Sequence, residues 1–144
     1  MKKVYPVIFT KTEECVLVEV PDLSIITEAK DMVEAIDMAR DAIGLRGITM
    51  EDLGQVIPEA TAIAQMDPSR GTFAAEGSGF VSLVDVDFVE YRRRVDNRTV
   101  RRNVTLPNWL NREAEAAKIN VSKVLQEALM AKLDIVRPLS GRRG

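Results

Sequence analysis

The sequence predicts an α+β protein in two parts: a small N-terminal β-sheet with a packed helix, then a strand and two helices. Three observations predict it. The first part contains short segments rich in β-branched and aromatic residues and one amphipathic segment. The second contains an alternating segment, a proline and two segments with helical spacing. The charge also changes sign, because residues 1–91 carry 7 Lys and Arg against 17 Asp and Glu, whereas residues 92–144 carry 13 against 5.

Two strands are predicted at the start of the chain. Val4–Thr10 and Cys15–Val20 are rich in β-branched residues, and the polar residues between them indicate a β-hairpin. Pro6 suits the edge of a sheet or the beginning of a strand. Pro21 should end the second strand, and Ser24–Thr27 is a candidate for a short third one.

A helix is predicted to follow these strands. Asp31 is its expected N-cap, and Glu34 stands where a capping box needs it. Gly44 is the expected end of the helix, and a second short helical turn is expected to begin at Thr49. The apolar face should pack against the hairpin. Its residues recur at helical spacing and are Met32, Val33, Ile36, Ala39 and Ile43.

The remainder of the first part is predicted to be irregular up to a final strand. Residues 55–79 contain several prolines and glycines, with one extended piece expected at Ala60–Ala64. Phe80–Phe88 alternates apolar residues with Asp85 and Asp87, which predicts a strand with one solvated face. The expected order of elements is therefore β-β-(β)-α-β.

The second part begins with an alternating segment over residues 99–106. Seven or eight residues of strand are not stable alone, so the partner strand must come from the first part or from another copy of the chain. The apolar face consists of Val100, Val104 and Leu106, interrupted by Arg102, and the polar face consists of Arg101, Asn103 and Thr105.

Two helices are predicted after this strand. Pro107 should end the strand and open the first helix, and Asn120 resembles an N-cap of the second. Two helices of about three turns each cannot bury their apolar faces alone, so dimerisation through the strand is expected, with Trp109 in the core or rim of the dimer. The apolar positions are Leu110, Ala114 and Ala117, then Val121, Val124, Leu125, Ala128, Leu129 and Leu133.

Residues 99–133 (TVRRNVTLPNWLNREAEAAKINVSKVLQEALMAKL) resemble the ribbon-helix-helix family of bacterial and phage repressors. The resemblance implies a homodimer whose paired strands enter the major groove of operator DNA. The alternative interpretation is a solvated strand with helices that serve only dimerisation. The base-reading residues would be Arg101, Asn103 and Thr105, and the phosphate-binding residues would be Asn120, Val121, Ser122 and Lys123.

Phrases along nearly the whole chain resemble the HicB antitoxin family. They are YPVIF, VEVPDL, DMVEAIDMARDAI, Ile57-Pro58 and VSLVDVDFVEYRRR. The resemblance implies a pared-down ribonuclease H-like fold in the first part and a HicA-like RNA-cleaving toxin as partner, with repression of the shared operon by the second part. The chain departs from the family at Ser24–Ile26, where many members have a glycine-containing turn.

These observations predict four regions: a toxin-binding α/β domain over residues 1–91, a basic linker over 92–98, a ribbon-helix-helix domain over 99–136 and a disordered tail over 137–144. The acidity of the first region suits a basic toxin, although it is equally typical of a soluble surface. The expected function is that of an antitoxin and autorepressor that binds DNA as a homodimer, with a tetramer as the open alternative. The competing hypothesis is a ligand-responsive transcriptional regulator without a toxin.

Composition argues against several other functions. The chain has no histidine and a single cysteine, Cys15, which rules out imidazole chemistry, an internal disulfide and a cysteine-based metal cluster. Asp85 and Asp87, with Asp22, are the candidates for a metal-dependent nuclease, but solvated carboxylates explain them better. We expect no enzyme activity, cofactor or metal. No apolar run approaches the ~20 residues of a membrane span and no signal peptide is recognised, so a cytoplasmic location is expected.

Overall fold

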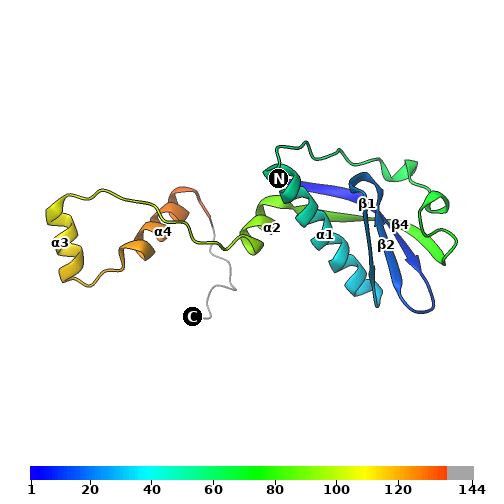
Figure 1. Ribbon diagram of the computed structural model, residues 1–144, viewed down its shortest axis with the longest axis horizontal. Coiled ribbons are helices and arrows are strands. Elements are labelled where there is room, and N and C mark those ends of the chain that lie inside the picture. Colours follow the sequence, from blue (N-terminus) through cyan, green and yellow to red (C-terminus); the bar gives the residue numbers. More distant parts are fainter. Residues whose placement is uncertain (136–144) are drawn as a thin grey trace. The chain divides into compact units, whose positions relative to one another are not determined.

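The structure is a computed structural model that describes residues 1–135 (Figure 1). Its contacts divide the chain into two compact units, with the division between Arg98 and Thr99. All four strands and the helices α1 and α2 belong to the first unit, and α3 and α4 belong to the second. The tail predicted over residues 137–144 lies outside the described residues.

The first unit contains an antiparallel four-stranded sheet in the order β3-β2-β1-β4. The predicted hairpin is confirmed, the candidate third strand is present, and the predicted final strand ends one residue earlier than expected, at Asp87. The α+β class and the order of these elements are therefore as predicted. The strands are β1 (Lys2–Lys11), β2 (Val16–Val20), β3 (Ile25–Ala29) and β4 (Ser78–Asp87).

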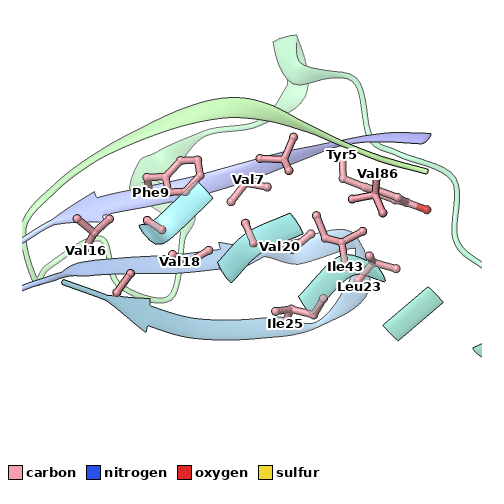
Figure 2. Close-up of a cluster of buried hydrophobic side chains, with 14 of the residues drawn as sticks. Tyr5, Val7, Phe9, Val16, Val18, Val20, Leu23, Ile25, Ile43 and Val86 are labelled. Atoms are coloured by element: carbon pink, nitrogen blue, oxygen red, sulfur yellow. The ribbon is translucent and has the colours of Figure 1, made fainter. Parts of the chain in front are cut away.

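Strand β1 lies inside the sheet, and its side chains Tyr5, Val7 and Phe9 belong to the core cluster on one face (Figure 2). The strand is buried on its other face as well. The edge position expected for Pro6 is therefore wrong. The strand accommodates this proline because β1 pairs with β2 only from Ile8 onward, so the missing N–H of Pro6 removes no bond to β2. The side chains in the hydrophobic core are Tyr5, Val7 and Phe9, and those buried on the opposite face are Pro6, Ile8 and Thr10.

Helix α1 (Met32–Asp52) covers one face of the sheet. Its predicted cap is confirmed, because the Asp31 carboxylate accepts the Glu34 amide at 2.9 Å. The Glu34 carboxylate accepts the Lys30 amide at 3.1 Å, one residue before the position that a capping box uses. The helix continues through Gly44, so the end predicted there is wrong, and Thr49 belongs to the same helix.

The glycines of α1 allow α2 (Phe88–Val95) to pack closely against it. A Cβ atom on Gly44 would lie 2.5 Å from the Tyr91 ring, and one on Gly47 would lie 2.1 Å from the Phe88 ring. This packing outweighs the low helix propensity of glycine and explains why α1 does not end there. The first four residues of the predicted linker, 92–95, are helical because α2 is buried against α1.

The segment between α1 and β4 crosses the other face of the sheet. It is irregular, as predicted, apart from two short 3-10 helices at Ile63–Gln65 and Pro68–Arg70. The expected extended piece at Ala60–Ala64 is interrupted by the first of these. The amide and hydroxyl of Thr72 donate to the Glu19 carboxylate of β2 at 2.9 and 2.6 Å, which holds the segment over the sheet.

The second unit contains α3 (Asn108–Ala116) and α4 (Val121–Lys132). Both helices were predicted, and Pro107 directly precedes α3 as expected. Residues 96–107 form neither helix nor strand. The strand predicted over residues 99–106 is not formed in the single chain, since a strand needs a neighbour for its backbone hydrogen bonds. None of the helices within residues 1–135 has both the length and the apolar character needed to cross a membrane.

We expect Gly47→Ala to destabilise the protein, although alanine is the better helix former. The added methyl group would meet the Phe88 ring, and overpacking of this kind costs about 1–3 kcal/mol. Urea unfolding followed by circular dichroism measures the change. Thr49→Ala, at an exposed position of the same helix, is the control and should change the free energy of unfolding by less than about 0.5 kcal/mol. Equal stability of Gly47→Ala and the wild type would contradict the close packing of α2.

Candidate functional site

The three residues predicted to read DNA bases lie in the irregular segment before α3. Arg101, Asn103 and Thr105 are exposed, and their side chains take part in none of the hydrogen bonds or ion pairs found in residues 1–135. Every second residue of an extended backbone points to the same side, so a strand over this segment would align all three. The single chain leaves them free but does not assemble them into a surface.

The predicted phosphate site is the beginning of α4. The Asn120 side chain caps this helix and accepts the Lys123 amide at 3.1 Å, as the sequence indicated. Val121, Ser122 and Lys123 form the exposed first turn. Backbone amides at a helix N-terminus attract anions, and the ammonium group of Lys123 adds a positive charge there. The arrangement is therefore suited to contact with a phosphate oxygen.

The second unit does not bury any side chain of its own in the described part of the chain. Every residue from 99 to 135 is exposed or only partly covered, including Trp109 at 64% and Val100 at 88% exposure. Amphipathic helices that leave their apolar faces in water gain little stability from tertiary packing. The described part of this unit therefore has no hydrophobic core of its own. Its exposed large apolar residues are Val100, Val104, Trp109, Leu110, Ile119, Val121, Val124, Leu129 and Leu133.

Asp85, one of the two aspartates considered for metal binding, is engaged by basic side chains. Its carboxylate accepts a hydrogen bond from the Arg40 guanidinium at 3.2 Å and pairs with the Lys2 ammonium at 3.3 Å. The hydrogen bond from Arg40, followed by those from Lys2, lowers the pKa of Asp85 below its ordinary value. Asp85 therefore joins β4 to α1 and β1.

The other two aspartates also have structural contacts. Asp87 caps α2 by accepting the amides of Val89 and Glu90 at 3.0 and 3.2 Å. Asp22 accepts the amide and the hydroxyl of Thr61 at 2.9 and 2.6 Å. Within residues 1–135, no three His, Cys, Asp or Glu side chains gather as metal ligands would. The predicted strand placed Asp85 and Asp87 near each other, but each has a separate partner.

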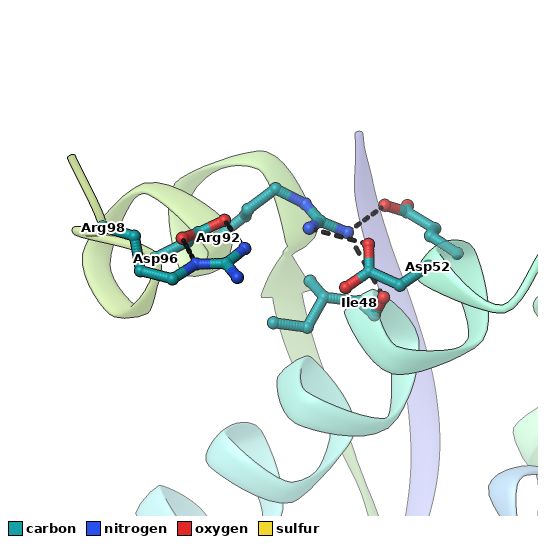
Figure 3. A network of polar contacts seen from close by, with 6 residues as sticks. Ile48, Asp52, Arg92, Asp96 and Arg98 are labelled. Carbon is teal, nitrogen blue, oxygen red and sulfur yellow. Dashed lines mark hydrogen bonds and ion pairs between the residues drawn. The ribbon is translucent and has the colours of Figure 1, made fainter. Parts of the chain in front are cut away.

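A cluster of charged residues joins α2 to the C-terminal end of α1 (Figure 3). The Arg92 guanidinium donates to Glu51 at 3.0 Å and to the Ile48 carbonyl at 3.2 Å, and it pairs with Asp52 at 3.0 Å. The predicted position of Arg92 in a linker is therefore wrong, because Arg92 belongs to α2. The sequence signal for this contact is the pair Glu51 and Asp52 at the C-terminal end of α1. Acidic residues are unfavourable at a helix C-terminus, so a nearby cation such as Arg92 stabilises them.

Comparisons with known proteins add a family and a fold. The family model described as "HicB_like antitoxin of bacterial toxin-antitoxin system" matches residues 5–134. The chain is also similar to one in a toxin-antitoxin complex from Streptococcus pneumoniae, at 21% identity over 92% of this chain and 99% of that one, with a TM-score of 0.57. It resembles the antitoxin HicB from Burkholderia pseudomallei at 20% identity over 92% and 97%, with a TM-score of 0.49. No curated protein matches the chain.

The stability that Asp85 provides should depend on pH. Its pKa is lower in the folded protein than the ordinary 3.8, so the stabilisation is present above that pH and is lost as the pH falls through the folded value. Asp85→Asn should therefore be less stable than the wild type near neutral pH, and the difference should vanish in acid. Urea unfolding across that range measures it. Glu13→Gln, at an exposed loop position, should stay close to the wild type. A difference independent of pH would contradict the pairing.

Proposed function

The chain belongs to the family of HicB-like antitoxins of bacterial toxin–antitoxin systems, and we propose that it neutralises a HicA-like RNA-cleaving toxin and represses its own operon. The family match covers residues of both units, so the proposal assigns a role to each of them. The observation that carries the proposal is the contrast between an acidic unit with its own core and a basic unit that buries no side chain in its described residues, 99–135. The two parts of the function follow this division.

The acidic first unit is the proposed toxin-binding domain. A protein that binds and cleaves RNA needs a positively charged surface, because RNA is a polyanion. The first unit, residues 1–98, carries 18 acidic against 11 basic residues, which favours association with such a surface and steers the encounter. We further propose that the four-stranded sheet and α1 are the pared-down ribonuclease H-like fold of this family. The order β-β-β-α-β and the antiparallel sheet support that assignment.

The second unit is the proposed ribbon-helix-helix domain. In a homodimer, residues 99–106 of two chains would pair as antiparallel strands, which supplies the neighbour that the single chain lacks. The exposed apolar faces of α3 and α4 would then be buried between the two copies. Arg101, Asn103 and Thr105 would face the bases in the major groove.

The proposed phosphate contacts lie at the beginning of α4, where the Asn120 side chain accepts the Lys123 amide and the amides of Val121 and Ser122 have no partner within the helix. Val121, Ser122 and Lys123 would hold the DNA backbone and fix the register of the ribbon without reading sequence. Binding by a dimer implies an operator with two-fold symmetry and an affinity that falls steeply with salt. A tetramer formed from two such dimers is the alternative assembly.

Affinity purification with the full chain as bait tests the antitoxin proposal. We expect a small basic protein to be retained from the native cell lysate, to be released by high salt, and to be toxic when it is expressed alone. Its toxicity should disappear when this chain is expressed with it. Retention of no such protein would favour the ligand-responsive regulator instead.

Arg101→Ala tests the base-reading role. Loss of a bidentate contact with a guanine should weaken binding to the operator by about 1–3 kcal/mol while leaving binding to unrelated DNA almost unchanged. Titration of labelled operator at fixed salt measures both. Arg46→Ala, which removes one exposed arginine from α1, is the matched control and should leave both affinities unchanged. An unchanged operator affinity for Arg101→Ala would remove this residue from the outer face of the ribbon.

A further inference from the structure

Strand β4 forms an open edge of the sheet in the first unit. We propose that this edge is where the toxin docks, by adding an extended segment of its own as a fifth strand beside residues 79–83. The inference rests on the proposed function, because it assumes that the partner is a basic toxin. It adds the surface that is used and the mode of binding, namely strand addition, in which backbone hydrogen bonds provide much of the affinity.

The length and composition of β4 distinguish it from an ordinary edge strand. It pairs with β1 along all ten residues from Ser78 to Asp87 and has no strand on its other side. Natural edge strands are commonly short or carry lysine or proline, which prevents pairing with other chains. β4 has neither residue, and its charged residues, Asp85 and Asp87, lie at its end, whereas the opposite edge strand, β3, is half as long. The part of the β4 edge before these aspartates is therefore a template for another strand.

The contact between Arg40 and Asp85 indicates which backbone groups are available. The Arg40 Nε donates to the Asp85 carbonyl oxygen at 3.0 Å, and Arg40 belongs to α1, so this carbonyl points away from β1. In an antiparallel pair, the peptide groups of alternate residues point toward and away from the neighbouring strand. Those of Gly79, Val81 and Leu83 therefore also point outward. Arg40 closes the edge at Asp85, and the open section lies before it.

Exposed apolar side chains flank this open section on both faces of the sheet. Leu83 is 52% exposed and Phe80 is 40% exposed, and their odd and even positions place them on opposite faces of β4. Phe80 lies beside Phe9, with the ring centroids 5.7 Å apart. An added strand would extend both faces and cover part of each side chain, which gives the site apolar contacts in addition to backbone bonds.

Charge favours a basic partner over a second copy of this chain. Two copies that met edge to edge through β4 would bring together two units with a large excess of acidic residues, which repel each other. A basic segment is attracted by the same charge. Glu76 lies just before the open section and is exposed, so it is placed to meet a positively charged residue of the toxin. The acidic charge of the first unit therefore favours the basic toxin, and not a second copy of this chain, as the partner that pairs with β4.

Leu83→Lys in the full chain tests the docking surface. The probe is the small basic protein that the affinity purification described above retains, purified on its own. An edge lysine should weaken binding of the probe by about tenfold or more, because it opposes strand pairing and repels a basic partner. Ile26→Lys is the matched control, since Ile26 is 57% exposed on the other edge strand and on the same sheet face, and the charge change is identical. The affinity of Ile26→Lys for the probe should stay within about twofold of the wild-type affinity.

Amide hydrogen exchange of the wild-type chain provides a second measurement that does not depend on any variant. The amides of Val81 and Leu83 should exchange rapidly in the free protein and become protected when the probe binds. Equal binding by Leu83→Lys and the wild type, or no protection of these amides in the complex, would overturn strand addition and leave the antitoxin proposal intact. Failure of the wild-type chain to bind the probe would overturn both proposals.

Discussion

The pairing of β1 with β2 on one side and β4 on the other organises the first unit, because residues 5–10 of this strand are buried on both faces of the sheet. Tyr5, Val7 and Phe9 place α1 on one face, and Ile8 lies under the segment that crosses the other. β4 is held along its full length by the same strand. The edge proposed for toxin binding is consequently rigid, which reduces the conformational entropy lost on association.

The contact between α1 and α2 extends the first unit beyond its sheet. Two glycines three residues apart in α1 face two aromatic residues three residues apart in α2, so the helices approach closely over one turn each. Arg92 adds hydrogen bonds at the end of α1. The basic residues that follow β4 thus belong to the folded first unit, and the division of the chain falls after Arg98. A change of charge along a sequence does not by itself mark a boundary between units.

Local features of the sequence predicted much of the fold. β-branched composition predicted β1 and β2, alternation predicted β4, and the caps at Asp31 and Asn120 are contacts within three residues. Gly44 was misjudged because glycine is common at helix ends, whereas its role here depends on Tyr91, far along the chain. The position of Arg92 depends on α1 in the same way. For the candidate site, the cap of α4 was predictable, but the arrangement of Arg101, Asn103 and Thr105 depends on pairing with a second chain and stays a prediction.

Residues 99 to 135 bury no side chain, and this affects how the amount of DNA-binding dimer depends on the concentration of the chain. If two copies fold only on meeting, folding and association are a single second-order equilibrium, and the folded population depends on chain concentration. When most chains are unpaired, proteolysis that halves their number lowers the amount of DNA-binding dimer about fourfold. The toxin-binding capacity proposed for the first unit would fall only twofold, because this unit has its own core and does not need a second copy to fold. On the proposed function, a loss of chains would therefore weaken repression of the operon more steeply than it reduces toxin binding.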